Sequence, residues 1–105
     1  MRETLQKLVD KMNEDPSGLD HLSATYNFIL SEGGQYSIEF FDQGVELNEE
    51  ATDHAKCSLR LKKENLHKLI DGQLNATSAF MMGKIKVDGN IGLALKLQNV
   101  LNNYR

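Results

Sequence analysis

Apolar residues near the start of the chain recur with the spacing of one helix face. At positions i, i+3, i+4 and i+7 stand Leu5, Leu8, Val9 and Met12. This spacing predicts an amphipathic helix over about residues 2–14, with one apolar stripe that must pack on another part of the chain. The segment Asp15-Pro16-Ser17-Gly18 predicts the end of that helix, because proline cannot continue it and glycine favours a turn.

Between residues 24 and 61 the period changes to two, which predicts four strands. Their alternating apolar members are Tyr26, Phe28 and Leu30; Tyr36, Ile38 and Phe40; Val45 and Leu47; and Cys57, Leu59 and Leu61. Gly33-Gly34 and Asp42-Gln43-Gly44 are turn signals between the first three strands, so an antiparallel meander with hairpin links is expected. The polar segment Asn48 to Lys56 is expected to be a solvated crossing to the fourth strand.

Helical spacing returns beyond Leu61 and predicts two short helices. Leu66, Leu69 and Ile70 share one face of the first, and Gly72 can adopt the left-handed conformation that commonly ends a helix. Asn75 is a candidate N-cap for the second helix, which Gly83 would end. The apolar residues of this second helix are Ala79, Phe80, Met81 and Met82.

A last helix is expected from Asn90, its candidate N-cap, to about Asn103, after a fifth strand over Lys84 to Asp88. At roughly 100° per residue its apolar side chains spread over an arc of about 220°, which is more than packing on one layer requires. They are Ile91, Leu93, Ala94, Leu95, Leu97, Val100, Leu101 and Tyr104. The surplus predicts that the helix faces two apolar surroundings, one the sheet and the other a cavity, a partner chain or a lipid.

Gln98 projects into this arc, and a buried amide without a partner costs about 1–3 kcal/mol. The sequence leaves two partners open for Gln98: the polar head of an otherwise apolar ligand, or the backbone of a neighbouring loop. Met81 and Met82 beside Phe80 indicate an adaptable surface, since methionine fills irregular shapes, although for each methionine taken alone ordinary core packing is the better explanation.

Composition narrows the function classes. The length of 105 residues predicts a single domain over residues 1–105. The net charge of −3 argues against nucleic acid as a partner, because phosphate binding requires a basic surface. One cysteine excludes an internal disulfide, so a cytoplasmic location is expected. No segment approaches the roughly 18 apolar residues of a membrane span, so stable membrane insertion is not expected.

The residue types that carry catalysis are scattered. His21, His54 and His67 are isolated, with no His-x-x-His, His-Glu-x-x-His or cysteine pair, which argues against a metal site. Cys57 lies in an alternating strand, where a small buried hydrophobe is the better interpretation than a nucleophile. Gly89-Asn90-Ile91-Gly92 opens a helix but lacks the dinucleotide and P-loop spacings. We therefore expect no cofactor, no metal and no enzymatic activity.

The segment Ala79 to Gln98 resembles the sterol carrier protein 2 family. The family's Ala-Phe pair stands at Ala79-Phe80, its Gly-Lys strand start at Gly83-Lys84, and its Gly-Asn-x-Gly-Leu-Ala-x-Lys-Leu helix from Gly89 to Leu97. The detailed match covers about the last half of the chain, and the first half agrees in its helix-then-strands layout. The chain ends at Arg105 without the C-terminal extension and peroxisomal address of eukaryotic relatives, which favours a bacterial-type stand-alone member.

The resemblance implies an α+β fold with a five-stranded sheet, helices covering one face, and an apolar tunnel between them. The implied function is non-catalytic binding or transfer of a sterol, fatty acid or fatty acyl-CoA. By carry-over, the residues that would line or cap the tunnel are Phe80, Met81, Ile85, Ile91, Leu95 and Gln98, with Phe28, Ile38 and Phe40 as candidate opposite walls. The alternative function is an interaction module that homodimerises through the apolar C-terminal helix.

Overall fold

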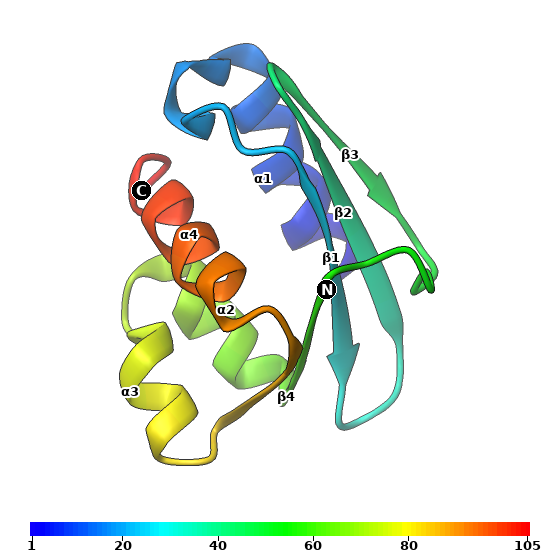
Figure 1. Cartoon of the computed structure of the whole chain (residues 1–105), viewed down its shortest axis with the longest axis vertical. Helices are drawn as coiled ribbons and strands as arrows, with labels where there is room; N and C mark the ends of the chain where they lie inside the picture. The colour runs from blue at the N-terminus through cyan, green and yellow to red at the C-terminus, as the bar shows by residue number, and fades with distance from the viewer.

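The order of elements along the chain follows the changes of periodicity in the sequence. The computed structural model describes all residues, 1–105 (Figure 1). In chain order the elements are α1 (Arg2–Glu14), the 3₁₀ turn η1 (Pro16–Leu19), β1 (Ala24–Leu30), β2 (Gln35–Phe41), β3 (Gly44–Asn48), β4 (Cys57–Leu61), α2 (Lys63–Asp71), α3 (Ala76–Met81), β5 (Ile85–Gly89) and α4 (Ile91–Asn102). The predicted helices and strands are all present, and only η1 was not predicted.

Local capping signals set the ends of the later helices, as the sequence predicts. The Asn75 side chain accepts hydrogen bonds from the backbone N–H groups of Thr77 and Ser78 at the start of α3. Asn90 does the same for Leu93 at the start of α4. Gly72 ends α2 with a φ of 84°, a left-handed conformation that other residues adopt only with strain.

The five strands form one mixed sheet in the order β3-β2-β1-β4-β5. The antiparallel meander β1-β2-β3 is confirmed, and β5 pairs antiparallel with β4. In addition β4 pairs with β1 in parallel, a pairing that the sequence did not indicate. The resulting α+β architecture, with a five-stranded sheet, is the predicted one.

Neighbouring strands are in a register that pairs apolar residues with apolar residues. These apolar side chains all lie on the face of the sheet that the helices cover. Tyr26 pairs with Ile38 and with Cys57, and Leu59 pairs with Val87. On this face α1, α2 and α4 meet the strands around a shared core, as their side chains Leu5, Leu66 and Leu97 all approach Phe28 and Ile38. The interface between helices and sheet therefore holds most of the buried apolar side chains.

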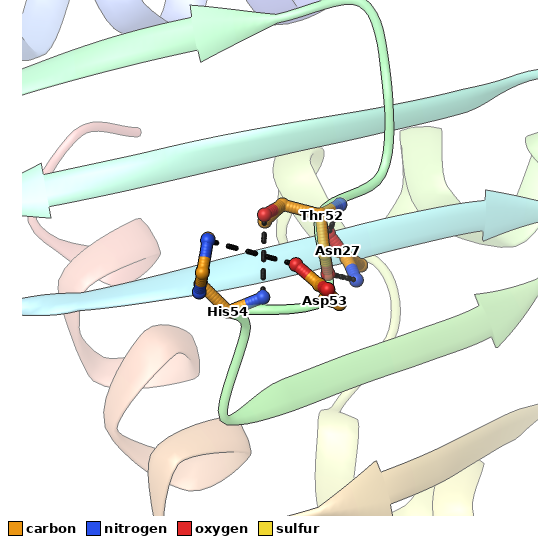
Figure 2. Close-up of polar contacts among 4 residues, drawn as sticks. All are labelled: Asn27, Thr52, Asp53 and His54. Atoms are coloured by element: carbon orange, nitrogen blue, oxygen red, sulfur yellow. Dashed lines mark hydrogen bonds and ion pairs between the residues drawn. The ribbon is translucent and has the colours of Figure 1, made fainter.

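The other face of the sheet is crossed by the polar connection between β3 and β4. Asn27, which is 6% exposed, donates from Nδ2 to the backbone oxygen of Thr52 (2.8 Å) and accepts from its N–H at Oδ1 (2.9 Å). Figure 2 shows this pair together with Asp53 and His54, whose side chains remain in solvent. The segment crosses to the fourth strand as predicted, and Asn27 fixes it to β1 so that β4 can lie beside β1.

One glycine is required by a close approach between segments. A Cβ atom at Gly89 would lie 2.3 Å from the backbone oxygen of Lys56, and its φ is +101°. The next residue, Asn90, donates its N–H to the same oxygen at 2.9 Å. This contact places the start of α4 beside the start of β4, and with it Ile91.

We expect Asn27→Ala to lower the free energy of unfolding by about 2 kcal/mol. The change removes two hydrogen bonds to Thr52, each worth about 0.5–1.5 kcal/mol. Urea denaturation measures the change. Thr25→Ala, on the same strand face two residues earlier and without a side-chain hydrogen bond, is the control and should cost less than half as much. Equal costs for the two variants would contradict the role of Asn27.

Candidate functional site

An apolar cavity of about 110 Å³ lies between α3, α4 and the β4-β5 end of the sheet. It exists because α3 packs on β5 and α4 at the outer edge of the molecule and not on the centre of the sheet (Figure 1). Of its thirteen lining residues, eleven are hydrophobic. They are Leu59, Leu69, Ala76, Thr77, Phe80, Met81, Ile85, Val87, Ile91, Ala94, Leu95, Leu97 and Gln98.

Strand alternation and the turn of α4 bring these side chains together. On β5, Ile85 and Val87 face the cavity, while the intervening Lys86 pairs with Arg60 on the opposite face of the sheet. On α4 the wide apolar arc divides between two surroundings, as the sequence predicts. Ile91 and Leu95 border only the cavity, and Leu97 also reaches the core under α1.

The opening of the cavity is surrounded by exposed apolar side chains. Met81 is 84% exposed, Ile91 49%, Leu95 42% and Phe80 36%. Met82, at 66%, follows Met81 at the end of α3 but does not line the cavity. We refer to the four that line the cavity, Phe80, Met81, Ile91 and Leu95, as the apolar rim. Only one other large hydrophobic residue is exposed, Phe41 on β2, so exposed apolar surface is concentrated at the mouth.

Gln98 binds the backbone of α3, which is one of the two partners that the sequence left open. Its Oε1 accepts the N–H of Ala76 at 2.8 Å, and its Nε2 donates to Oδ1 of Asn102 at 3.2 Å. Gln98 is 9% exposed and also forms part of the cavity wall. Because Ala76 is the first residue of α3, this hydrogen bond fastens α3 to α4 and holds one side of the cavity in place.

A second and smaller apolar space, of about 10 Å³, lies deeper in the core. It is bordered by α1, α2, α4 and the middle of the sheet. Its lining residues are Leu5, Leu8, Met12, Phe28, Ile38, Phe40, Leu66, Ile70, Leu97 and Leu101. Leu97, which is 2% exposed, is the only side chain that borders both spaces, so it forms the partition between them.

Six of the nine residues proposed from the sequence lie in the cavity wall: Phe80, Met81, Ile85, Ile91, Leu95 and Gln98. Phe28, Ile38 and Phe40 do not. They sit on the helix-covered face, but on β1 and β2, whereas the cavity lies over β4 and β5. They therefore border the smaller space, and the two spaces are separate pockets where the resemblance implies a tunnel. Ligand contact by any of these residues remains a prediction.

Sequence reasoning missed seven further lining residues: Leu59, Leu69, Ala76, Thr77, Val87, Ala94 and Leu97. Some of them carried a usable signal. Leu59 and Val87 are alternating strand positions that pair across β4 and β5, and Ala94 and Leu97 belong to the wide arc of α4. Thr77 carried no such signal, because nothing in the sequence shows which side of the short helix α3 turns inward.

The thiol of Cys57 and the hydroxyl of Tyr26 are buried in the core and do not line the cavity. Cys57 is fully buried, and burial raises the pKa of its thiol to about 11, so the predicted role as a small core residue is confirmed. Burial, with a contribution from Cys57, also raises the pKa of Tyr26. The Tyr26 hydroxyl donates to the backbone oxygen of Leu93 at 2.7 Å and so fixes α4 to the sheet.

Metal ligands are not grouped in this structure. No set of three or more His, Cys, Asp and Glu side chains is arranged to hold a metal ion. None of the helices is long and apolar enough to cross a membrane. The cavity itself offers only apolar contacts, the Thr77 side chain and the Gln98 amide.

Comparison with known proteins identifies the family to which the chain and its fold belong. The model of the SCP-2 sterol transfer family matches residues 3–102. The chain therefore belongs to this family, and the resemblance found in the sequence is confirmed. Domains of this family generally bind or transfer lipids and are not themselves catalytic.

Three relatives illustrate the match. Hydroxysteroid dehydrogenase-like protein 2 from Bos taurus is 30% identical over 105 residues, which are 97% of this chain and 25% of the relative. The chain thus spans about a quarter of that relative's length. The solution structure of sterol carrier protein domain 2 of Helicoverpa armigera has a TM-score of 0.80 at 25% identity, covering 97% of this chain and 85% of that one. Palmitated SCP2L2 from Aedes aegypti has a TM-score of 0.68 at 20% identity, covering 94% and 92%.

We expect Gln98→Leu to lower stability by about 1–3 kcal/mol, because it leaves the Ala76 N–H without its acceptor. For a domain of this size each kcal/mol corresponds to a fall of about 4–8 °C in Tm. The control is Asn102→Ala, which removes the exposed partner of Gln98 and keeps the bond to Ala76. Thermal melts in which the two variants lose the same stability would show that the Ala76 contact is unimportant.

Proposed function

We propose that this domain binds the acyl chain of a fatty acid or fatty acyl-CoA in the cavity between α3 and α4, and carries it without chemical change. The observation that carries the proposal is the apolar cavity that opens through the apolar rim. Concave apolar pockets with few polar groups are the usual form of small-molecule sites. The palmitated relative from Aedes aegypti, which shares the fold, supports an acyl ligand.

The size of the cavity favours an acyl chain over a sterol. An engineered apolar cavity of about 150 Å³ in another protein holds a benzene molecule, so a space of about 110 Å³ holds a ligand segment of similar size. The four fused rings of a sterol are rigid, so a sterol cannot place only a small segment in a cavity of this size. An acyl chain can insert its end, and each buried methylene contributes about 0.8 kcal/mol.

The charged head of such a ligand belongs outside the cavity. No charged side chain lines the wall, and an unpaired carboxylate in an apolar space is strongly disfavoured. Thr77 and Gln98 are the two lining residues that are not hydrophobic. The amide nitrogen of Gln98 carries two hydrogens, and one of them is donated to Asn102. We assign the second to a hydrogen bond with a polar atom of the ligand.

The alternative function, homodimerisation through α4, has less support. Five of the eight apolar residues in the arc of α4 are buried within the chain itself: Ala94, Leu97, Val100, Leu101 and Tyr104. Of the remaining three, only Ile91 and Leu95 are exposed. The wide arc is thus largely accounted for by the core and the cavity.

We further propose that Leu97 limits how deep a chain reaches. A chain entering from the rim meets Leu97 at the partition, and behind it lies the smaller space. Rotation or truncation of this side chain would join the two spaces and lengthen the site.

Protein purified from cells is expected to carry a fatty acid or similar amphiphile, because an apolar cavity of this kind is better filled than empty. Native mass spectrometry measures the bound mass.

Leu95→Glu should weaken binding of a fluorescent fatty acid about fivefold or more, since it places a charge at the mouth. The control is Phe41→Glu, at a similarly exposed apolar residue away from the cavity. A ligand-free mass, with no displacement of the probe at micromolar protein, would refute the proposal.

Leu97→Ala is expected to raise the preference for palmitate over octanoate. Each further methylene that enters the joined space contributes about 0.8 kcal/mol, a factor of about four in affinity. Leu101→Ala is the matched control, because Leu101 is equally buried but borders only the smaller space. Both changes cost stability, about 2–5 kcal/mol, so titrations are performed where melts show each variant folded. An unchanged chain-length preference in Leu97→Ala would rule out the partition.

A further inference from the structure

The face of the sheet that the helices leave uncovered is polar, and the two signs of charge lie on opposite sides of it. Residues 1–55, which include β1, β2 and β3, contain twelve acidic and three basic side chains. Residues 56–105, which include β4 and β5, contain three acidic and nine basic ones. In the strand order β3-β2-β1-β4-β5, the strands β2 and β3 lie on one side of β1, and β4 and β5 lie on the other.

Like charges stand directly opposite each other on both sides of this face. Glu39 of β2 pairs with Glu46 of β3, and Arg60 of β4 pairs with Lys86 of β5. All four residues alternate with core positions, so their side chains lie on the polar face. Like charges in such cross-strand pairs destabilise a sheet. Arg60 is balanced by Asp88 at 2.8 Å, but neither glutamate has a cation within salt-bridge distance.

On the basic side the polar face is hollowed into a groove. Its charged lining residues are Arg60, Lys62, Lys68, Lys84, Lys86 and one acidic residue, Glu64. Glu64 is bound by Lys68 at 3.2 Å. The side chains of Lys62, Lys84 and Lys86 are exposed and have no carboxylate within salt-bridge distance. The groove, which we call the basic groove, therefore offers three free ammonium groups to an anionic partner.

The connection between β3 and β4 rises above the same face. It covers the outward-facing residues Asn27 and Ser37, which are 6% and 1% exposed. Figure 2 shows the connection in front of the strands, with the helices behind them. Glu50 is exposed and has no cation within salt-bridge distance, and the Asp53 side chain is 95% exposed. We call residues 49–54 of this connection the acidic ridge.

We propose that the polar face is the interface of a homodimer, in which the acidic ridge of each copy lies in the basic groove of the other. Asn27, under the ridge, and Ile29, in the wall of the groove, are two residues apart on β1, so ridge and groove lie side by side. A two-fold axis between them, in the plane of the face, exchanges ridge and groove and makes both contacts at once. Glu39 borders the same hollow as the ridge and is approached by the lysines of the second copy.

The interface is separate from the proposed lipid site and does not rest on it. Cavity and interface lie on opposite faces of the sheet, because Lys86 alternates along β5 with the cavity residues Ile85 and Val87. The mouths of both cavities therefore stay free in the dimer. The contact is also distinct from dimerisation through α4, which would cover the mouths.

The polar face favours a second copy over other partners because it carries both signs of charge. A polyanion or an anionic lipid surface would be attracted to the basic groove but repelled by the acidic ridge and by the glutamates beside it. A second copy brings carboxylates to the groove and lysines to the ridge in the same event. Exposed ion pairs contribute little stability each, and charge complementarity determines orientation more than strength. The dimer is therefore expected to be weak and sensitive to salt.

Analytical ultracentrifugation of the full chain, in a concentration series from about 10 µM to about 1 mM, covers the range of weak association. We expect the dissociation constant of the dimer to be at least about tenfold higher at about 0.5 M salt than at about 0.02 M, because the screening length falls from about 20 Å to about 4 Å. Lys86→Glu and Glu50→Lys should each raise the dissociation constant about tenfold or more, since each places like charges together at two symmetric contacts.

Mixing the two variants separates a lost contact from a folding defect. In the heterodimer of Lys86→Glu with Glu50→Lys, one contact is unmodified and the other joins the two reversed charges. The heterodimer should therefore be at least about fivefold tighter than either variant alone. The matched controls are Lys7→Glu and Asp10→Lys, which make the same changes of net charge at exposed positions of α1, and they should dimerise like the unmodified chain.

Several results would overturn the proposal. They are a chain that stays monomeric over the whole concentration range, a dimer that is insensitive to salt, equal effects of interface and control variants, and a mixture in which dimerisation does not recover. A dimer that Leu95→Glu dissociates would place the contact at the cavity mouth instead. A monomer that binds polyglutamate through the basic groove would show that the groove serves a different acidic partner.

Discussion

The structure depends on one constraint, which is that the sheet is apolar on a single face and this face must be covered. The helices α1, α2 and α4 supply most of the cover, and at the β5 edge of the sheet α4 shares it with the short helix α3. Since α3 packs mainly on β5 and α4, it encloses the cavity without filling it. The Gln98 bond to Ala76 keeps α3 at this distance, and Tyr26 holds α4 against the sheet on the other side.

Much of this could be predicted from sequence because the deciding signals are local. The alternation of apolar and polar residues predicted the strands, and asparagine and glycine residues predicted the helix ends. The wide apolar arc of α4 indicated a second apolar surface. The parallel pairing of β4 with β1 could not be predicted, because it joins segments about 30 residues apart and no local turn signal links them. Phe28 was assigned to a cavity that it does not line, because alternation shows which face of the sheet a side chain lies on but not which strands are neighbours.

The partner of Gln98 could not be chosen from sequence either, since an amide in an apolar arc satisfies a ligand and a backbone group equally well. The structure shows the backbone contact, and with it a link between site and stability. The residues that border the cavity also hold the fold together, as Leu97 illustrates by belonging to both spaces. A ligand that fills the cavity is then expected to stabilise the whole domain and not only its mouth.

The parallel placement of β4 beside β1 also orders the events of folding. The β1-β2-β3 meander is built from neighbouring segments joined by short turns, so its contacts close small loops and form early. Tyr26 and Leu93, by contrast, are 67 residues apart, so their contact closes a much larger loop and is expected to form late. The cavity is thus expected to be the last part of the molecule to be assembled, and until then the apolar surfaces of α3 and α4 are open to any lipid or chaperone nearby.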